Sequence, residues 1–125
     1  PNLDRVIRIK TSTCRGGIIE NVFVRDITVG QCREAVLRIN LQYENRENCN
    51  RNFPPVVRNV HLKNVTCEKS RLGVLIIGLD DDQHVYNISV EDSHFNNVAK
   101  GTNDIKGAKD VTLKNLYING KLVKK

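Results

Sequence analysis

The chain contains few aromatic residues and no long apolar run. Phe, Trp and Tyr together make up 5% of its 125 residues, and Trp is absent. With so few rings and no basic helix, the sequence lacks the motifs that stack on the bases of nucleic acids. No apolar run approaches the roughly 20 residues that a membrane-spanning helix needs. We therefore expect neither a nucleic-acid partner nor a membrane-embedded segment.

Linkers and targeting signals are missing as well. No stretch has the composition of a linker between two domains, so we expect one domain or part of one across residues 1–125. The first residues lack the basic, apolar and small-residue order of a secretion signal, so a signal was either removed or never present. Charged residues alternate with Val, Ile and Leu throughout, which predicts a packed core rather than disorder.

The cysteines do not follow the spacing of a known site. Cys14, Cys32, Cys49 and Cys67 match neither a C-x-x-C redox pair nor a zinc-ligand cluster, so we expect no metal. Two disulfides are possible, in three different pairings. Cys67 occupies an apolar slot of the repeat described below, so we expect it to be a thiol of the core.

The chain is basic, with a formal net charge of +6 and a pI near 9.3. This charge favours an anionic partner: nucleic acid, acidic lipid or an acidic polysaccharide. Charge alone does not choose among them. A basic surface that only improves solubility is the alternative.

Four segments share one pattern. Each opens with Asn or Asp, and apolar residues follow at the next position and two positions later, a spacing typical of strands. Asp or Asn returns five residues after the opening position, and the apolar positions then continue one step out of phase, with Ser93 as the exception. The opening positions are Asn21, Asn59, Asn87 and Asp110, and the second polar positions are Asp26, Asn64, Asp92 and Asn115.

The change of phase predicts a corner. A flat strand would send the second apolar pair to the wrong face. If the chain bends at the Asp or Asn, both pairs can face one interior, and these residue types tolerate left-handed backbone angles. Each segment is therefore predicted to form a strand, a corner and a second strand.

A third kind of strand lies between these segments. Residues 5–11, 35–41 and 73–79 (RVIRIKT, AVLRINL and GVLIIGL) align without gaps, and we expect a weaker fourth copy around residues 98–102. The alignment predicts two inward columns: Ile7, Leu37 and Leu75, and Ile9, Ile39 and Ile77. The predicted outward columns are Arg8, Arg38 and Ile76, and Lys10, Asn40 and Gly78.

Units of about three short strands, none able to bury its apolar face alone, are typical of a stacked coil. We predict an all-β fold, a parallel β-helix (solenoid) of about four rungs, in which equivalent residues stack about 4.8 Å apart. The polar insert at residues 44–55 would form a loop at a turn of the coil. An antiparallel β-sandwich is the alternative, but we expect none of the Asn-Gly or Asp-Gly hairpin turns that such a fold favours.

Arg8 and Lys10 flank Ile9 and would point to solvent beside Arg38 and Asn40 of the next rung. Arg offers a planar fork to a carboxylate and Lys a mobile point charge, so this patch suits uronic acids or phosphates. A solvated strand face, partly paired in salt bridges, is the alternative.

The Arg-Ile-Lys motif at residues 8–10, followed by strand-corner-strand coils, resembles the polygalacturonase family of glycoside hydrolases. The resemblance covers essentially the whole chain and implies a right-handed parallel β-helix, secreted or periplasmic. It implies that Arg8 and Lys10 bind a substrate carboxylate and that Tyr43, one rung downstream, completes the subsite. The implied partners are pectin and oligogalacturonate.

The family's Asn-Thr-Asp, Asp-Asp and Gly-His-Gly motifs precede Arg-Ile-Lys and do not fit in the residues before Arg8. The resemblance therefore implies a C-terminal fragment, inactive alone and prone to end-to-end association. The parent enzyme would hydrolyse α-1,4-galacturonosyl linkages with inversion, using two carboxyl groups and no cofactor or metal. The alternatives are a non-catalytic module that binds acidic glycans and a pectate lyase-like protein that uses calcium.

The remaining polar motifs receive structural interpretations. Asp80–His84 follows a strand as a turn, and we expect its acids to be solvated rather than catalytic. His61, His84 and His94 are expected to stand alone, so no pair of nucleophile and base is predicted. Asn64 and Asn87 open glycosylation acceptor sequences, but we expect both to serve the repeat.

Overall fold

The computed structural model describes residues 2–3, 7–11, 16–42 and 54–123. Within these ranges the chain is all β, and no helix of a length that could cross a membrane occurs in them. The strands are β1 (Asn2–Leu3), β2 (Ile7–Lys10), β3 (Ile18–Val29), β4 (Gln31–Cys32), β5 (Ala35–Asn40), β6 (Val56–Cys67), β7 (Leu72–Ile77), β8 (Val85–Phe95), β9 (Asp104–Lys106), β10 (Lys109–Ile118) and β11 (Lys121–Leu122).

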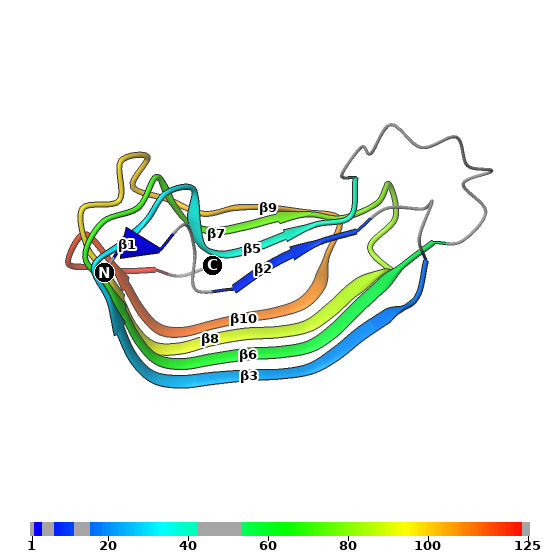
Figure 1. Ribbon diagram of the computed structural model, residues 1–125, viewed down its shortest axis with the longest axis horizontal. Coiled ribbons are helices and arrows are strands. Elements are labelled where there is room, and N and C mark those ends of the chain that lie inside the picture. The colour runs from blue at the N-terminus through cyan, green and yellow to red at the C-terminus, as the bar shows by residue number, and fades with distance from the viewer. Residues whose placement is uncertain (1, 4–6, 12–15, 43–53, 124–125) are drawn as a thin grey trace.

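Two sheets face each other across the interior (Figure 1). Strands β2, β5, β7 and β9 form a four-stranded parallel sheet in that order. The second sheet, here called the long sheet, has the order β11-β10-β8-β6-β3, and its four long strands are parallel. A short third side joins β1 to β4 and Ser70 to Val98. The parallel pairing excludes the antiparallel β-sandwich.

The chain visits the sheets in the same order four times, in repeat units 7–32, 35–70, 72–98 and 104–118. Hydrogen-bonded side chains in neighbouring units are 38, 28 and 23 residues apart, in chain order. The pairing of the strands is thus preserved while the connecting loops change in length. The predicted insert accounts for the longest interval, although residues 43–53 lie outside the described part of the chain.

The predicted corners are confirmed at all eight positions. Asn and Asp at the opening and second polar positions have φ between 50° and 61°, in the left-handed region. These are residue types that enter this region more readily than other non-glycine residues. The long strands therefore bend twice, as Figure 1 shows.

The corner side chains also bond to one another from unit to unit. Asn64 Nδ2 donates to Asp26 Oδ1 at 2.8 Å, and Asn115 Nδ2 donates to Asp92 Oδ1 at 2.8 Å. At the other corner, Asn59 donates to Asn21, and Asn87 Nδ2 donates to Asn59 Oδ1 at 3.2 Å. Glycine would permit the same backbone but could not form these ladders.

Both apolar pairs of each segment face the interior, as predicted. In the second unit Val60, Leu62, Val65 and Cys67 are all fully buried. The exception Ser93 is also fully buried, and its hydroxyl accepts the Val65 N–H at 3.1 Å and donates to the Glu91 carbonyl at 2.8 Å. The serine is tolerated in the core because both of its hydrogen bonds are made.

The predicted register of β7 is wrong by one residue. Leu37 pairs with Val74 and Ile39 with Ile76, so Val74 and Ile76 point inward. Leu75 and Ile77, predicted to be inward, instead lie outside that core; Leu75 joins a separate small cluster with Ala35 and Leu72.

The predicted fourth copy is also misplaced. The fourth strand of the four-stranded sheet is β9, which pairs with β7, whereas Val98 lies on the third side, opposite Ser70. The pairing is not parallel throughout either, because Asn119 and Gly120 form a turn that returns β11 antiparallel to β10. This Asn-Gly pair is a strong hairpin signal that the sequence reading passed over.

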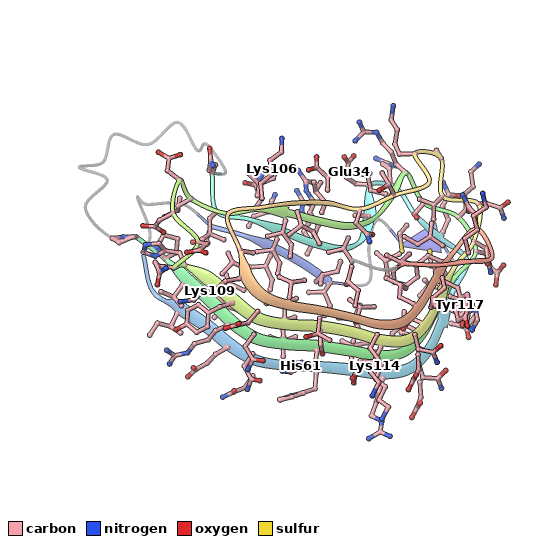
Figure 2. The ribbon with its side chains drawn as sticks, turned by 180° about the vertical axis from the view of Figure 1, so that it is seen from behind. Glu34, His61, Lys106, Lys109, Lys114 and Tyr117 are labelled. Atoms are coloured by element: carbon pink, nitrogen blue, oxygen red, sulfur yellow. The ribbon has the colours of Figure 1, made fainter. Side chains whose placement is uncertain are left out.

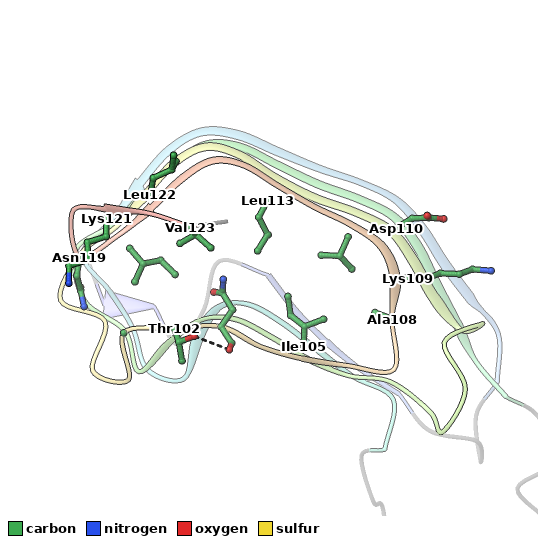
Figure 3. A pocket seen from close by; sticks show the side chains of 14 residues that line it. Thr102, Ile105, Ala108, Lys109, Asp110, Leu113, Asn119, Lys121, Leu122 and Val123 are labelled. Atoms are coloured by element: carbon green, nitrogen blue, oxygen red, sulfur yellow. Dashed lines mark hydrogen bonds between the residues drawn. The ribbon is translucent and has the colours of Figure 1, made fainter. Parts of the chain in front are cut away.

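The hairpin lies at the C-terminal end of the stack. A hollow of about 770 Å³ opens there, between β9 and β10, with Ile105, Leu113 and Val123 among its lining residues (Figure 3). Val123 packs against the core, and its N–H bonds to the Leu116 carbonyl at 2.8 Å. Because of this hollow, the last unit is less buried than the two before it.

The corner geometry predicts the effect of a β-branched residue. Asn64→Val should lower the free energy of unfolding by about 1–3 kcal/mol, because valine is strained at positive φ. Asn64→Gly should lose less, since it keeps the backbone and forfeits only the bond to Asp26. Asn96→Val is the control, because Asn96 is not in the left-handed region. Equal losses for Asn64→Val and Asn96→Val in urea unfolding would contradict the role of the corner.

Candidate anion-binding face

The outer face of the four-stranded sheet carries the residues singled out by the Arg-Ile-Lys motif. The pairing of β2 with β5 sets Arg8 beside Arg38 and Lys10 beside Asn40. Ile9, between the two cations, is buried, while the Arg8 side chain is exposed. The predicted grouping of three cations and an amide is confirmed by this register.

Arg38 is half-buried. Its Nε atom is buried and has no hydrogen-bond partner among the described residues. A shallow hollow of about 500 Å³ adjoins it, lined by Leu75, Ile77 and Lys100 among others. At its rim, Arg71 Nη1 donates to Glu34 Oε1 at 2.6 Å. Since the Arg38 side chain lines the hollow, its guanidinium can donate to an anion bound there.

The floor of the hollow is apolar because of the corrected register. Leu72 and Leu75 are more than nine-tenths buried although they lie outside the main core. They continue the outward positions of Ala35 and Arg38 on the next strand. This face therefore combines cations at β2 and β5 with an apolar surface at β7.

Two charged residues of β9 were not predicted from the sequence. Asp104 pairs with Leu75 and Lys106 with Ile77, so they extend the columns of Arg8 and Lys10 to the fourth unit. Figure 2 shows Lys106 and Glu34 on the side of the four-stranded sheet, away from His61 and Lys114 on the outside of the long sheet. The acid Asp104 lies at the far end of the face from Arg8.

The ends of the strands on this face are tied by Gln42. Its backbone N–H bonds to Asn40 Oδ1 at 2.8 Å, and its Nε2 donates to the Gly78 carbonyl at 2.6 Å. Tyr43, the third predicted binding residue, lies outside the described residues. The structure therefore describes this face as far as Gln42.

The acidic turn is solvated, as predicted. Asp80, Asp81 and Asp82 are exposed between β7 and β8. Gln83 N–H bonds to Asp81 Oδ1 at 3.0 Å, and His84 Nε2 lies 3.5 Å from the same oxygen. These contacts stabilise a turn rather than pair two acids.

The prediction that His61 stands alone is wrong. His61 Nδ1 lies 2.5 Å from Ser89 Oγ, and Nε2 lies 2.6 Å from Asn59 Oδ1. Since Asn59 donates its amide to Asn21, its oxygen accepts from His61, and Nδ1 is left to accept the Ser89 hydroxyl. These hydrogen-bonded side chains lie on the outside of the long sheet, where Phe23 stacks on His61 with ring centroids 5.5 Å apart.

His94 is not isolated either, because it stacks on Tyr117 with centroids 5.0 Å apart. Both histidines contact residues of other units. The sequence signal that could have found them is the repeat itself, since His61 and Ser89, and likewise His94 and Tyr117, occupy equivalent positions of neighbouring segments.

No group of three or more His, Cys, Asp or Glu residues with the arrangement of a metal site occurs in the described part of the chain. Comparison of the chain with protein-family models, with curated proteins and with solved structures finds no match. A function is therefore inferred from the side chains of the outer face.

Gly78 is predicted to be indispensable for the closure of this face. A Cβ at this position would overlap the carbonyl group of Gly107 in the next unit. Gly78→Ala should therefore separate the third and fourth units and lower the free energy of unfolding by about 1–3 kcal/mol. Lys106→Ala, an exposed change on the neighbouring strand, should have little effect. A tolerated Gly78→Ala in chemical denaturation would show that the two backbones do not approach this closely.

Proposed function

We propose that the chain is the C-terminal part of a polygalacturonase-like glycoside hydrolase, which hydrolyses α-1,4-galacturonosyl linkages in pectin. The observation that carries the proposal is the register of β2 and β5, which gathers Arg8, Arg38, Lys10 and Asn40 on one face. In this proposal the face binds the carboxylates of an acidic polysaccharide.

We also propose that the fold is a right-handed parallel β-helix. Three features support it: the same order of strands in each unit, parallel pairing between successive units, and a third side that joins the two sheets. The Asn and Asp ladders at the corners are what stacked rungs require, because each polar side chain finds its partner one rung away. In a β-helix the outer sheet face is open to a long polymer.

The cations suit a uronic acid. Arg8 presents a planar fork of donors and Lys10 a mobile ammonium, so together they can hold a carboxylate in one orientation. Arg38 adds a second guanidinium one strand away. The apolar floor at Leu75 and Ile77 offers a surface to the C–H groups of a sugar ring. A polymer with a carboxylate on each residue uses the cations and the apolar floor together.

The described residues of this face position a substrate and do not hydrolyse it. Hydrolysis with inversion requires an acid and a base carboxyl group roughly 6.5–9.5 Å apart. The resemblance implies that an upstream part of a longer protein supplies both. We therefore expect the isolated chain to bind oligogalacturonate without cleaving it.

Binding by the isolated chain tests the face directly. Calorimetric titration with a galacturonic acid oligomer should show binding that weakens as salt rises, and a neutral glucose oligomer should not bind. Arg38→Ala should weaken this binding at least tenfold, because it removes the guanidinium beside the hollow. Lys114→Ala, on the outside of the long sheet, is the control and should bind like the unchanged chain. If the unchanged chain, Arg38→Ala and Lys114→Ala bound the oligomer equally, this face would not be the binding site.

Catalysis is tested in the complete parent protein. Arg8→Ala and Lys10→Ala should each lower kcat/KM by the equivalent of roughly 2–5 kcal/mol if they grip a desolvated carboxylate. Products that absorb in the ultraviolet and vanish with a chelator would identify a calcium-dependent lyase instead. Binding without any cleavage would identify a non-catalytic glycan-binding module.

A further inference from the structure

Two cysteines meet in the core, on the short third side of the fold. Cys32 ends β4 in the first unit, and Cys67 ends β6 in the second. Their Sγ atoms lie 3.4 Å apart, and both side chains are fully buried. They are 35 residues apart in the chain, so a bond between them would tie the first unit to the second.

The surroundings hold both thiols in place. The Lys69 carbonyl accepts the Cys32 N–H at 2.8 Å and lies 3.3 Å from Cys67 Sγ. Cys67 itself is aligned in the long sheet between Val29 and Phe95. In the first unit Val29 fills the position that Cys67 fills in the second. Packing alone therefore does not require a thiol at this position.

The thiols are also chemically prepared for a bond. The hydrogen bond with Cys32 lowers the pKa of the Cys67 thiol to about 7, against the opposing effect of burial. As the two units come together, contact with Cys32 therefore favours the thiolate of Cys67, the form that attacks a disulfide.

We propose that Cys32 and Cys67 are a modification site, at which a small disulfide oxidant such as oxidised glutathione creates a disulfide between the first two units. The Cys67 thiolate attacks one sulfur of the oxidant, forms a mixed disulfide and releases one glutathione thiol. Cys32, on losing its proton, attacks Cys67 Sγ and releases the second glutathione. Two protein thiols are oxidised and one glutathione disulfide is reduced to two thiols. Because both sulfurs are buried in the folded chain, the exchange takes place as the third side closes during folding.

The assignment goes beyond the proposed function and does not depend on it. Of the pairings that the sequence left open, it selects Cys32 with Cys67 and leaves Cys14 and Cys49, which lie outside the described residues. The bond would close a loop containing the long insert, and closing a loop of this size in the unfolded chain stabilises the fold.

The test uses a Cys14→Ser/Cys49→Ser variant, in which only the proposed pair remains. It is folded in a glutathione redox buffer, unfolded in acid, alkylated and mapped by mass spectrometry. We expect a cross-linked peptide containing Cys32 and Cys67, and a thermal midpoint that falls by roughly 10 °C when the bond is reduced. The further change Cys32→Ser should leave Cys67 open to alkylation and abolish the effect of the reductant.

Two results would overturn the proposal. One is quantitative alkylation of both cysteines after material folded in the redox buffer has been unfolded. The other, which covers a double variant that fails to fold, is a peptide map of the unchanged chain in which Cys32 or Cys67 is joined to Cys14 or Cys49. Neither result bears on polysaccharide binding, so the two proposals stand or fall separately.

Discussion

The fold depends on one backbone constraint, the left-handed conformation of the Asn and Asp residues at the corners. Because each corner shifts the alternation of side chains by one position, four apolar residues of a strand can enter the same interior. Without the corner at Asn64, Val65 and Cys67 would lie on the face opposite to Val60 and Leu62. The long sheet could then no longer close over the four-stranded sheet, and the outer face of that sheet would lose its support.

The corners also determine the register between units. Asp alternates with Asn along one corner column, in the order Asp26, Asn64, Asp92 and Asn115. An amide donates to a carboxylate in the bonds from Asn64 and Asn115, so a shift of the chain by one residue would leave these groups without partners. The same register then applies across the interior. Strands β2 and β5 belong to the same units as Asp26 and Asn64, so the stacking that pairs these two corner residues also sets Arg8 beside Arg38.

The sequence predicts the corners, the inward columns of the long sheet and the grouping of Arg8 with Arg38, because each rests on alternation of polar and apolar residues. It fails at β7, where GVLIIGL is apolar at nearly every position and alternation therefore indicates no phase. It misses β9 because three residues are too few for a pattern. The contact of His61 with Ser89 is implicit in the repeat, because each lies two positions after the opening Asn of its segment, but these are outward positions, for which the apolar pattern predicts no side-chain contacts.

Inward and outward columns are under different constraints, and this difference decides where charged residues can stand on the four-stranded sheet. The inward column Ile9, Ile39, Ile76 and Ile105 stays apolar, because each member packs on the next. The outward column changes from Arg8 and Arg38 to Leu75 and then Asp104, although the backbone is the same. Packing does not require this change. Positive charge is therefore concentrated at β2 and β5, whereas β9 carries one acid and one cation, Asp104 and Lys106. An acidic chain lying along the stack would meet its strongest attraction at β2 and β5.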